Sequence, residues 1–164
     1  MKTYKHLFLL ILFIGSQYSV AQVAEKTYLG TGLVYGSEVK GAGVGALAEF
    51  FLNDEISFSP QVNYFFPRRF SGGPKSSFWE INTNLNYYFY QSNEANIYGL
   101  GGINYANISG SRNPFSAINA RFGLNLGLGT NININSNFTP FAEARYVVSS
   151  YDQVVLFLGI KFSY

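Results

Sequence analysis

The chain has 164 residues, no cysteine and a formal net charge of +2, and its composition is 12% charged and 18% aromatic. This length suits one domain, the lack of cysteine excludes disulfides, and the charge balance does not suggest a nucleic-acid partner. Charged residues are about half as frequent as in soluble domains, yet no apolar run after position 21 is long enough for a membrane-spanning helix.

The first predicted element is a secretory signal peptide over residues 1–21. Lys2 and Lys5 precede an apolar run at 7–14, and residues 19–21 form a small-x-small cleavage site. The run is too short to cross a bilayer, which disfavours a retained anchor. Cleavage leaves residues 22–164 as one domain. Removing the two lysines from 11 basic residues leaves nine, against nine acidic ones, and His6 is removed with them.

Eight segments of period-two alternation follow, and no helical periodicity competes with them. Each has about ten residues or more, the length of a tilted membrane-crossing strand. Pro60 and Pro140 lie inside two of them, and we expect a local irregularity at each because proline lacks an N–H. The segments are residues 27–36, 41–52, 55–66, 78–90, 96–108, 119–134, 138–148 and 154–164.

The connections alternate between short polar turns ("NDE", "QSNEA", "NSN") and longer loops such as "PRRFSGGPKSS". Short turns at one end and longer loops at the other are typical of bacterial outer-membrane barrels. The sequence therefore predicts an all-β fold, a single eight-stranded antiparallel up-and-down transmembrane β-barrel.

The two faces of the predicted strands differ in size and polarity. In segment 119–134, Phe122, Leu124 and Leu126 share one parity, whereas Gly123 and Asn125 share the other. The small polar face suits the crowded inside of a narrow barrel, and the bulky face suits lipid. Segment 96–108 is ambiguous, since both parities hold apolar residues. A soluble, lipocalin-like barrel would instead need a highly charged outer face.

Charged residues within the strands fall mainly on the inward parity, where pairing avoids the roughly 2–4 kcal/mol cost of a lipid-facing Arg or Lys. We therefore expect a neutral, hydrogen-bonded network that plugs the lumen, because eight strands leave little room. A narrow channel for small solutes is the alternative. The residues are Glu49, Glu80, Arg121, Glu143, Arg145 and Lys161, with Glu143, Arg145, Arg121 and Lys161 at the centre.

The chain ends on "LGIKFSY", in which Gly159, Phe162 and Tyr164 have the spacing Gly-x-x-aromatic-x-aromatic. This spacing resembles the C-terminal signal by which the outer-membrane assembly machinery recognises its barrel substrates. It departs from that signal at Phe157, where a polar residue is usual.

From about residue 25 to 164 the chain resembles the small eight-stranded outer-membrane β-barrel family, the OmpA-barrel and OmpX-like group. "FTPFAEARYVV" at 138–148 is similar to its penultimate strand. The resemblance implies the outer membrane of a Gram-negative bacterium, with the turns in the periplasm and four loops at the cell surface. It favours a monomer with a structural or cell-surface interaction role. Aromatic girdles are expected at both membrane interfaces, with Tyr28 in the periplasmic one.

The loops form the only plausible partner surface. Arg68, Arg69, Lys75 and Arg112 are candidates for pairing with lipid A phosphates of lipopolysaccharide, although ordinary solvated loops explain them equally well.

Catalysis, metal and cofactor binding are not expected, so no residue is assigned to them. The domain at 22–164 has neither His nor Cys, the usual base, nucleophile activator and transition-metal ligands. A soluble periplasmic ligand-binding barrel is the third interpretation, after the plugged barrel and the narrow channel.

Overall fold

The computed structural model describes residues 26–69, 75–110, 119–134, 137–150 and 152–164. The predicted signal peptide and Arg112 lie outside this part of the chain.

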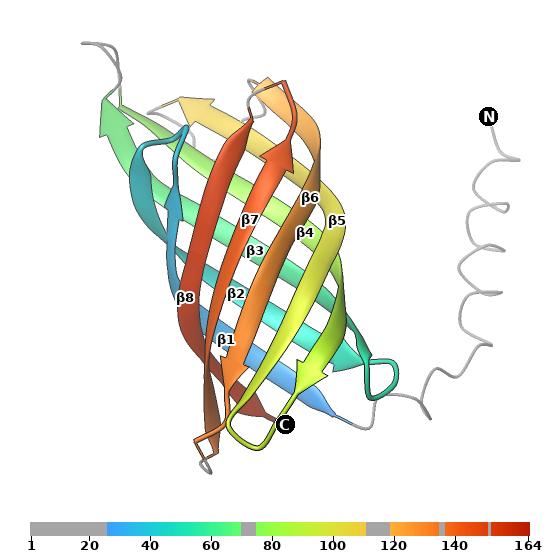
Figure 1. Ribbon diagram of the computed structural model, residues 1–164. Helices are drawn as coiled ribbons and strands as arrows, with labels where there is room; N and C mark the ends of the chain where they lie inside the picture. Colours follow the sequence, from blue (N-terminus) through green and yellow to red (C-terminus); the bar gives the residue numbers. More distant parts are fainter. Residues whose placement is uncertain (1–25, 70–74, 111–118, 135–136, 151) are drawn as a thin grey trace, which may run out of the picture.

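The described chain forms a closed antiparallel barrel, which confirms the predicted fold class (Figure 1). Each strand pairs with the next along the chain, and β8 closes the ring against β1 from Tyr28↔Ser163 to Gly36↔Val155. The strands are β1 (Thr27–Gly36), β2 (Gly41–Phe51), β3 (Ile56–Arg69), β4 (Lys75–Gln91), β5 (Ala95–Gly110), β6 (Asn119–Ile132), β7 (Phe138–Val148) and β8 (Gln153–Ser163).

Three strands reach further than predicted. The pairs Arg69↔Lys75 and Ser76↔Gly110 belong to ladders, so residues 67–69 and 75–77, expected in a loop, are strand. A β-bulge between Phe65 and Arg68 hides this extension, because it breaks the alternation by which strands are recognised.

The two ends of the barrel differ. The start of β1, the end of β8 and the strand ends joined by the β2–β3, β4–β5 and β6–β7 connections lie at one end, here named the turn end, at the bottom of Figure 1. The first turn is tight because Asn53 Oδ1 accepts hydrogen bonds from the Glu55 and Ile56 amides at 2.9 and 2.8 Å. The opposite ends of the strands form the other end of the barrel, here named the loop end.

Irregularities occur at both prolines, as expected. The β2–β3 pairs stop at Leu47↔Gln61 and resume at Phe50↔Phe58, and Pro60 falls in this gap. Pro140 pairs with Ile160 of β8, but the β6–β7 ladder ends at the pair Asn131↔Phe141 and does not include Pro140. Proline has no N–H to donate, so each interrupts the ladder on one side.

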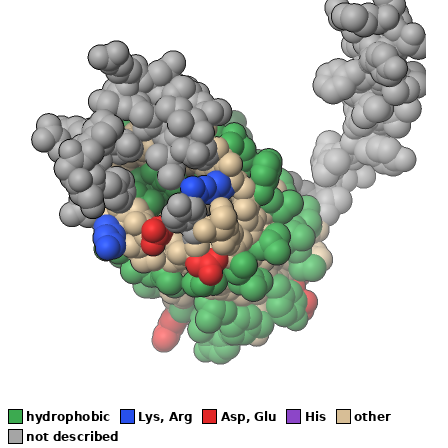
Figure 2. Space-filling model, turned by 90° about the horizontal axis from the view of Figure 1, so that it is seen from above, with side chains coloured by type: hydrophobic (Ala, Val, Ile, Leu, Met, Phe, Trp, Pro, Cys, Tyr) green, Lys and Arg blue, Asp and Glu red, His purple; other side chains and the backbone are tan. Residues whose placement is uncertain are grey.

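The outside of the barrel is apolar. Figure 2 shows hydrophobic side chains over the sides of the barrel that it leaves visible, and Leu124, Leu126 and Leu128 on β6 are 60%, 61% and 59% exposed. This confirms the predicted outward parity. No helix long and apolar enough to cross a membrane occurs among the described residues.

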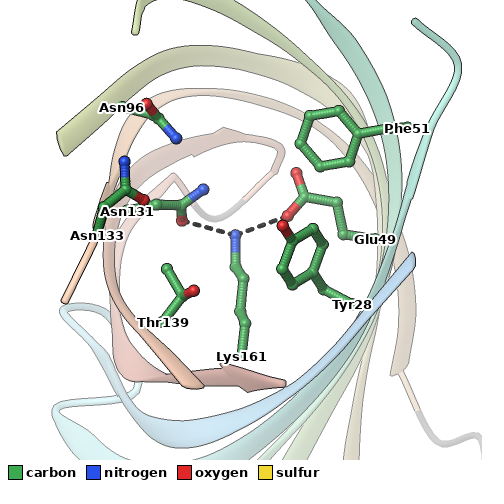
Figure 3. A pocket seen from close by; sticks show the side chains of 8 residues that line it. All are labelled: Tyr28, Glu49, Phe51, Asn96, Asn131, Asn133, Thr139 and Lys161. Carbon is green, nitrogen blue, oxygen red and sulfur yellow. Dashed lines mark hydrogen bonds and ion pairs between the residues drawn. The ribbon is translucent and has the colours of Figure 1, made fainter. Parts of the chain in front are cut away.

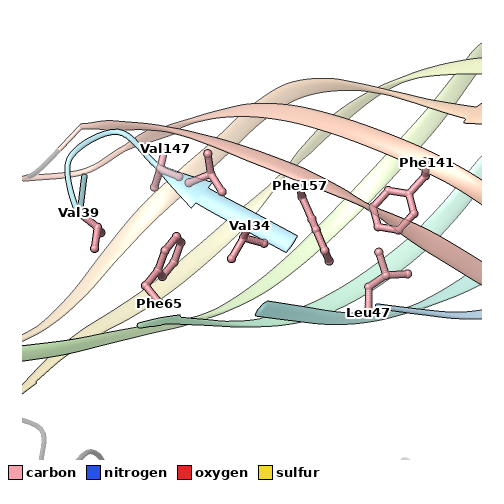
Figure 4. Packing of buried hydrophobic residues seen from close by; sticks show 8 residues of the cluster. Val34, Val39, Leu47, Phe65, Phe141, Val147 and Phe157 are labelled. Atoms are coloured by element: carbon pink, nitrogen blue, oxygen red, sulfur yellow. The ribbon is translucent and has the colours of Figure 1, made fainter. Parts of the chain in front are cut away.

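The inside is less polar than expected. An apolar cluster fills part of the lumen (Figure 4), so the expectation of a uniformly small or polar inner face was wrong. Inward glycines make room for its rings: a Cβ on Gly45 would lie 2.8 Å from the ring of Phe157. Tyr28 also departs from the expected girdle, because it lines the mouth of the lumen. The cluster contains Val34, Val39, Leu47, Phe65, Phe141, Val147, Val155 and Phe157.

Candidate functional site in the barrel lumen

The lumen has a polar wall and an apolar wall. Strands β1, β2, β7 and β8 supply most of the apolar cluster. The inward parity of β3–β6 supplies buried amides and hydroxyls. Because the two cations come from β7 and β8, they cross the lumen to reach their partners. The polar wall contains Ser57, Ser59, Gln61, Asn63, Asn82, Asn84, Asn86, Asn104, Asn125 and Asn131.

Glu80 on β4 is the centre of the first cluster. The Arg145 guanidinium from β7 forms an ion pair with Glu80 Oε1, and both side chains are almost completely buried. Asn63 Nδ2 donates to the same oxygen at 2.7 Å. Asn104 Nδ2 and Gln153 Nε2 donate to Oε2 at 3.3 and 3.2 Å. The carboxylate therefore has charged and neutral donors around it, as a buried anion requires.

Glu49 on β2 is the centre of the second cluster. Lys161 Nζ from β8 lies 2.8 Å from Glu49 Oε2 and donates to Asn131 Oδ1 at 3.0 Å. The hydroxyls of Ser57 and Tyr88 donate to Glu49 Oε1 at 2.5 and 2.6 Å. This ion pair connects β8 to β2 across the lumen.

Glu143 on β7 joins the two clusters. Its Oε1 accepts from the Tyr98 hydroxyl at 2.8 Å, and its Oε2 accepts from Gln61 Nε2 at 2.9 Å. Tyr98 in turn lies 3.5 Å from Lys161 Nζ, whereas Gln61 Oε1 accepts from Arg145. Hydrogen-bonded side chains therefore run without a break from the Glu80 cluster to the Glu49 cluster.

The structure thus brings together five of the six charges expected in the lumen, namely Glu49, Glu80, Glu143, Arg145 and Lys161. Arg121 departs from the expected central position, because it is only half-buried and lies near the loop end of β6. The buried set holds three carboxylates and two cations, so it carries one excess negative charge when fully ionised. Glu143 is the surplus acid, since its nearest cation is Arg145 at 3.9 Å.

Sequence reasoning missed the neutral members of the network. Gln61, Tyr88 and Asn131 have the inward parity predicted for their strands, a signal that was available, whereas Tyr98 lies in the segment whose parity was ambiguous. Which neutral side chain bridges which ion pair depends on the strand tilt and register, which the sequence alone does not give.

The other predicted site residues are dispersed. Gly159 faces inward, where a Cβ would lie 2.8 Å from the ring of Phe141, whereas Phe162 and Tyr164 are exposed. The backbones of Arg68, Arg69 and Lys75 lie in the loop-end extensions of β3 and β4. The assembly-signal and phosphate-binding roles of these residues stay predictions. Among the described residues, no group of three or more His, Cys, Asp or Glu side chains is placed to hold a metal ion.

A closed eight-stranded barrel with an exposed apolar belt and a polar, charged interior is the structure of a transmembrane β-barrel. The model of the outer membrane protein beta-barrel domain family matches residues 7–162, and the chain belongs to this family. The protein is therefore an outer-membrane barrel.

Solved structures agree on the fold. The N-terminal β-barrel domain of Pseudomonas aeruginosa OprF is 14% identical with a TM-score of 0.67, covering 87% of this chain and 100% of that one. Neisserial surface protein A is 15% identical with a TM-score of 0.67, covering 84% and 97%. Ail, the attachment invasion locus protein of Yersinia pestis, is 16% identical with a TM-score of 0.55, covering 85% and 97%. No curated protein matches the sequence.

Proposed function

We propose that the protein is a sealed, non-catalytic barrel with a structural or cell-surface interaction role. The observation that carries this proposal is the buried network, in which two cross-lumen ion pairs are joined through Glu143. An ion that passes along the lumen must disrupt these pairs, and leaving a buried charge without its partner costs about 3–5 kcal/mol.

The apolar cluster supports the same function from the other wall. Phe65, Phe157 and Val155 are fully buried inside the barrel, and Val34 is 2% exposed. The rings and branched side chains of this cluster fill space beside the ionic network, which supports a sealed lumen. A narrow channel stays the second candidate, because β3–β6 supply most of the buried amides and hydroxyls of the lumen.

The loop end is the proposed interaction surface. One neighbour, Ail, was solved in complex with the heparin analogue sucrose octasulfate and also in a phospholipid bilayer nanodisc. By analogy, we propose that Arg68, Arg69 and Lys75, with Arg112 from outside the described residues, face phosphate groups of lipopolysaccharide. In this orientation the turn end faces the periplasm. We further propose that the barrel is a monomer. The outer-membrane assembly machinery would recognise Gly159, Phe162 and Tyr164.

The test is conductance of the purified barrel, refolded and inserted into a planar lipid bilayer. We expect no conductance from the natural chain and a lower unfolding midpoint for the double variant Glu143→Gln with Arg145→Gln. The double variant removes the surplus acid together with the cation nearest to it, at 3.9 Å. Steady conductance from the natural chain refutes the sealed barrel and favours the channel.

A further inference from the structure

The turn end of the lumen holds a small pocket whose floor is the Glu49–Lys161 ion pair. Its volume is about 40 Å³, room for a few water molecules. Figure 3 shows its side chains directed toward a common centre, with aromatic rings on one side and amides on the other. The pocket is lined by Tyr28, Glu49, Phe51, Asn96, Asn131, Asn133, Thr139 and Lys161.

The charged groups of the floor are already satisfied. Lys161 Nζ has three partners for its three hydrogens, in Glu49, Asn131 and Tyr98. Glu49 accepts hydrogen bonds from Lys161, Ser57 and Tyr88, and also from Asn86. A charged ligand therefore finds no free counter-charge here, and it would pay for desolvation without compensation.

The rim, in contrast, offers unused polar groups. Among the described residues, the side chains of Tyr28, Asn96 and Thr139 have no hydrogen-bond partner. Asn133 uses its Nδ2 on the Ser92 carbonyl at 2.9 Å, which leaves its Oδ1 to accept. Both donors and acceptors are therefore available for an uncharged polar ligand.

The opposite wall is aromatic. Tyr28 and Phe51 pack edge to face with ring centroids 5.9 Å apart. A ligand that suits this pocket has an apolar part for the rings, an N–H and a C=O for the rim, no charge, and a size of about four heavy atoms. An acetamido group has all of these properties.

We propose that the turn-end pocket binds the acetamido group of a small uncharged ligand, as carried by an N-acetylated sugar or an acetylated peptide. The methyl packs on Tyr28 and Phe51, and the amide pairs with Asn96 and Thr139. This site is additional to the sealed lumen and does not depend on it, because the pocket ends at the ion pair.

The experiment is a nuclear magnetic resonance titration of the ¹⁵N-labelled barrel, residues 22–164, in lipid nanodiscs. N-acetylglucosamine and N-acetylglycinamide are the probes, and glucose and cationic glucosamine are the matched counter-probes. We expect both acetamido probes to shift the Asn96 and Asn133 side-chain signals, and the counter-probes to bind about tenfold more weakly. Binding of only one of the two probes supports the proposal and tells sugar from peptide.

Variants locate the site. Thr139→Val and Asn96→Leu each remove one rim hydrogen bond and should weaken binding about tenfold, whereas Asn93→Leu, in the exposed β4–β5 turn, should leave it unchanged. Heat-dependent migration on unboiled gels verifies that each variant is folded. The proposal is overturned if the acetamido probes leave the pocket signals unshifted, if the counter-probes bind equally well, or if the folded rim variants bind as the natural chain does.

Discussion

Tyr98 and Gly129 face each other across the β5–β6 ladder, and the ring of Tyr98 fills the space that a side chain at position 129 would need. Phe157 on β8 likewise fills the space beside Gly45 on β2, although these two strands are not paired, and a Cβ on Gly45 would lie 2.8 Å from its ring. These large-to-small contacts explain how a ring as large as that of Phe157 fits inside the barrel. The alternation placed the glycines inside, but it did not reveal which rings they accommodate.

At this scale we expect Gly129→Ala to destabilise the barrel by about 1–3 kcal/mol, the usual cost of overpacking. The new Cβ would lie 2.3 Å from the Tyr98 ring, whose hydroxyl holds Glu143. Gly99→Ala is the matched control, because a Cβ there meets nothing within 4 Å, and its effect should stay within about 0.5 kcal/mol. Urea unfolding in detergent, followed by the fluorescence of Trp79, measures both. Equal effects would contradict the packing described here.

At the scale of elements, alternation was sufficient to predict all eight strands and most inward and outward faces. It was not sufficient for β5, where Tyr98 and Leu100 turned out to face inward. It also failed at the loop-end extensions of β3, β4 and β5, and in the β3–β4 ladder a bulge shifts the register there. The charged residues of the lumen were predicted as a group. Which of them pair depends on which strands face each other across the lumen, and that follows only from the closure of the barrel.

The Glu49–Lys161 ion pair makes a testable connection between β2 and β8. Each single substitution, Glu49→Gln or Lys161→Met, should cost about 3–5 kcal/mol because it leaves a buried charge unpaired. The double variant should cost about 1–3 kcal/mol less than the sum of the singles. Glu55→Gln with Lys26→Met, at exposed positions of the turn end, provides a control cycle in which the effects should add. Additive behaviour of Glu49 and Lys161 as well would show that the two strands are not coupled through this pair.

At the scale of the whole molecule, the described lumen holds three buried carboxylates against two buried cations. The expectation of a neutral network counted Arg121 as the third cation. Inward parity alone does not distinguish a residue in the middle of a strand from one near its end. The surplus of one negative charge makes the three acids unequal in their contribution to stability.

We therefore expect Glu80→Gln and Glu143→Gln to differ. Glu80→Gln removes the ion-pair partner of Arg145 and should cost about 3–5 kcal/mol. Glu143→Gln removes the surplus charge while keeping a hydrogen-bonding side chain, so it should cost about 1 kcal/mol. Chemical unfolding of the two variants side by side measures the difference, and a larger loss for Glu143→Gln would contradict the assignment of Glu143 as the surplus acid.

The central claim, a sealed lumen, is tested most directly by thiol labelling, since the chain has no cysteine of its own. Ser59 is 1% exposed on the lumen wall and Ser150 is exposed at the loop end, so Ser59→Cys and Ser150→Cys are nearly isosteric probes of the two environments. With a charged, membrane-impermeant thiol reagent on the barrel in liposomes, we expect rapid labelling at position 150 and none at position 59 until the protein is boiled in SDS. Labelling of position 59 at a comparable rate would show that the lumen is open.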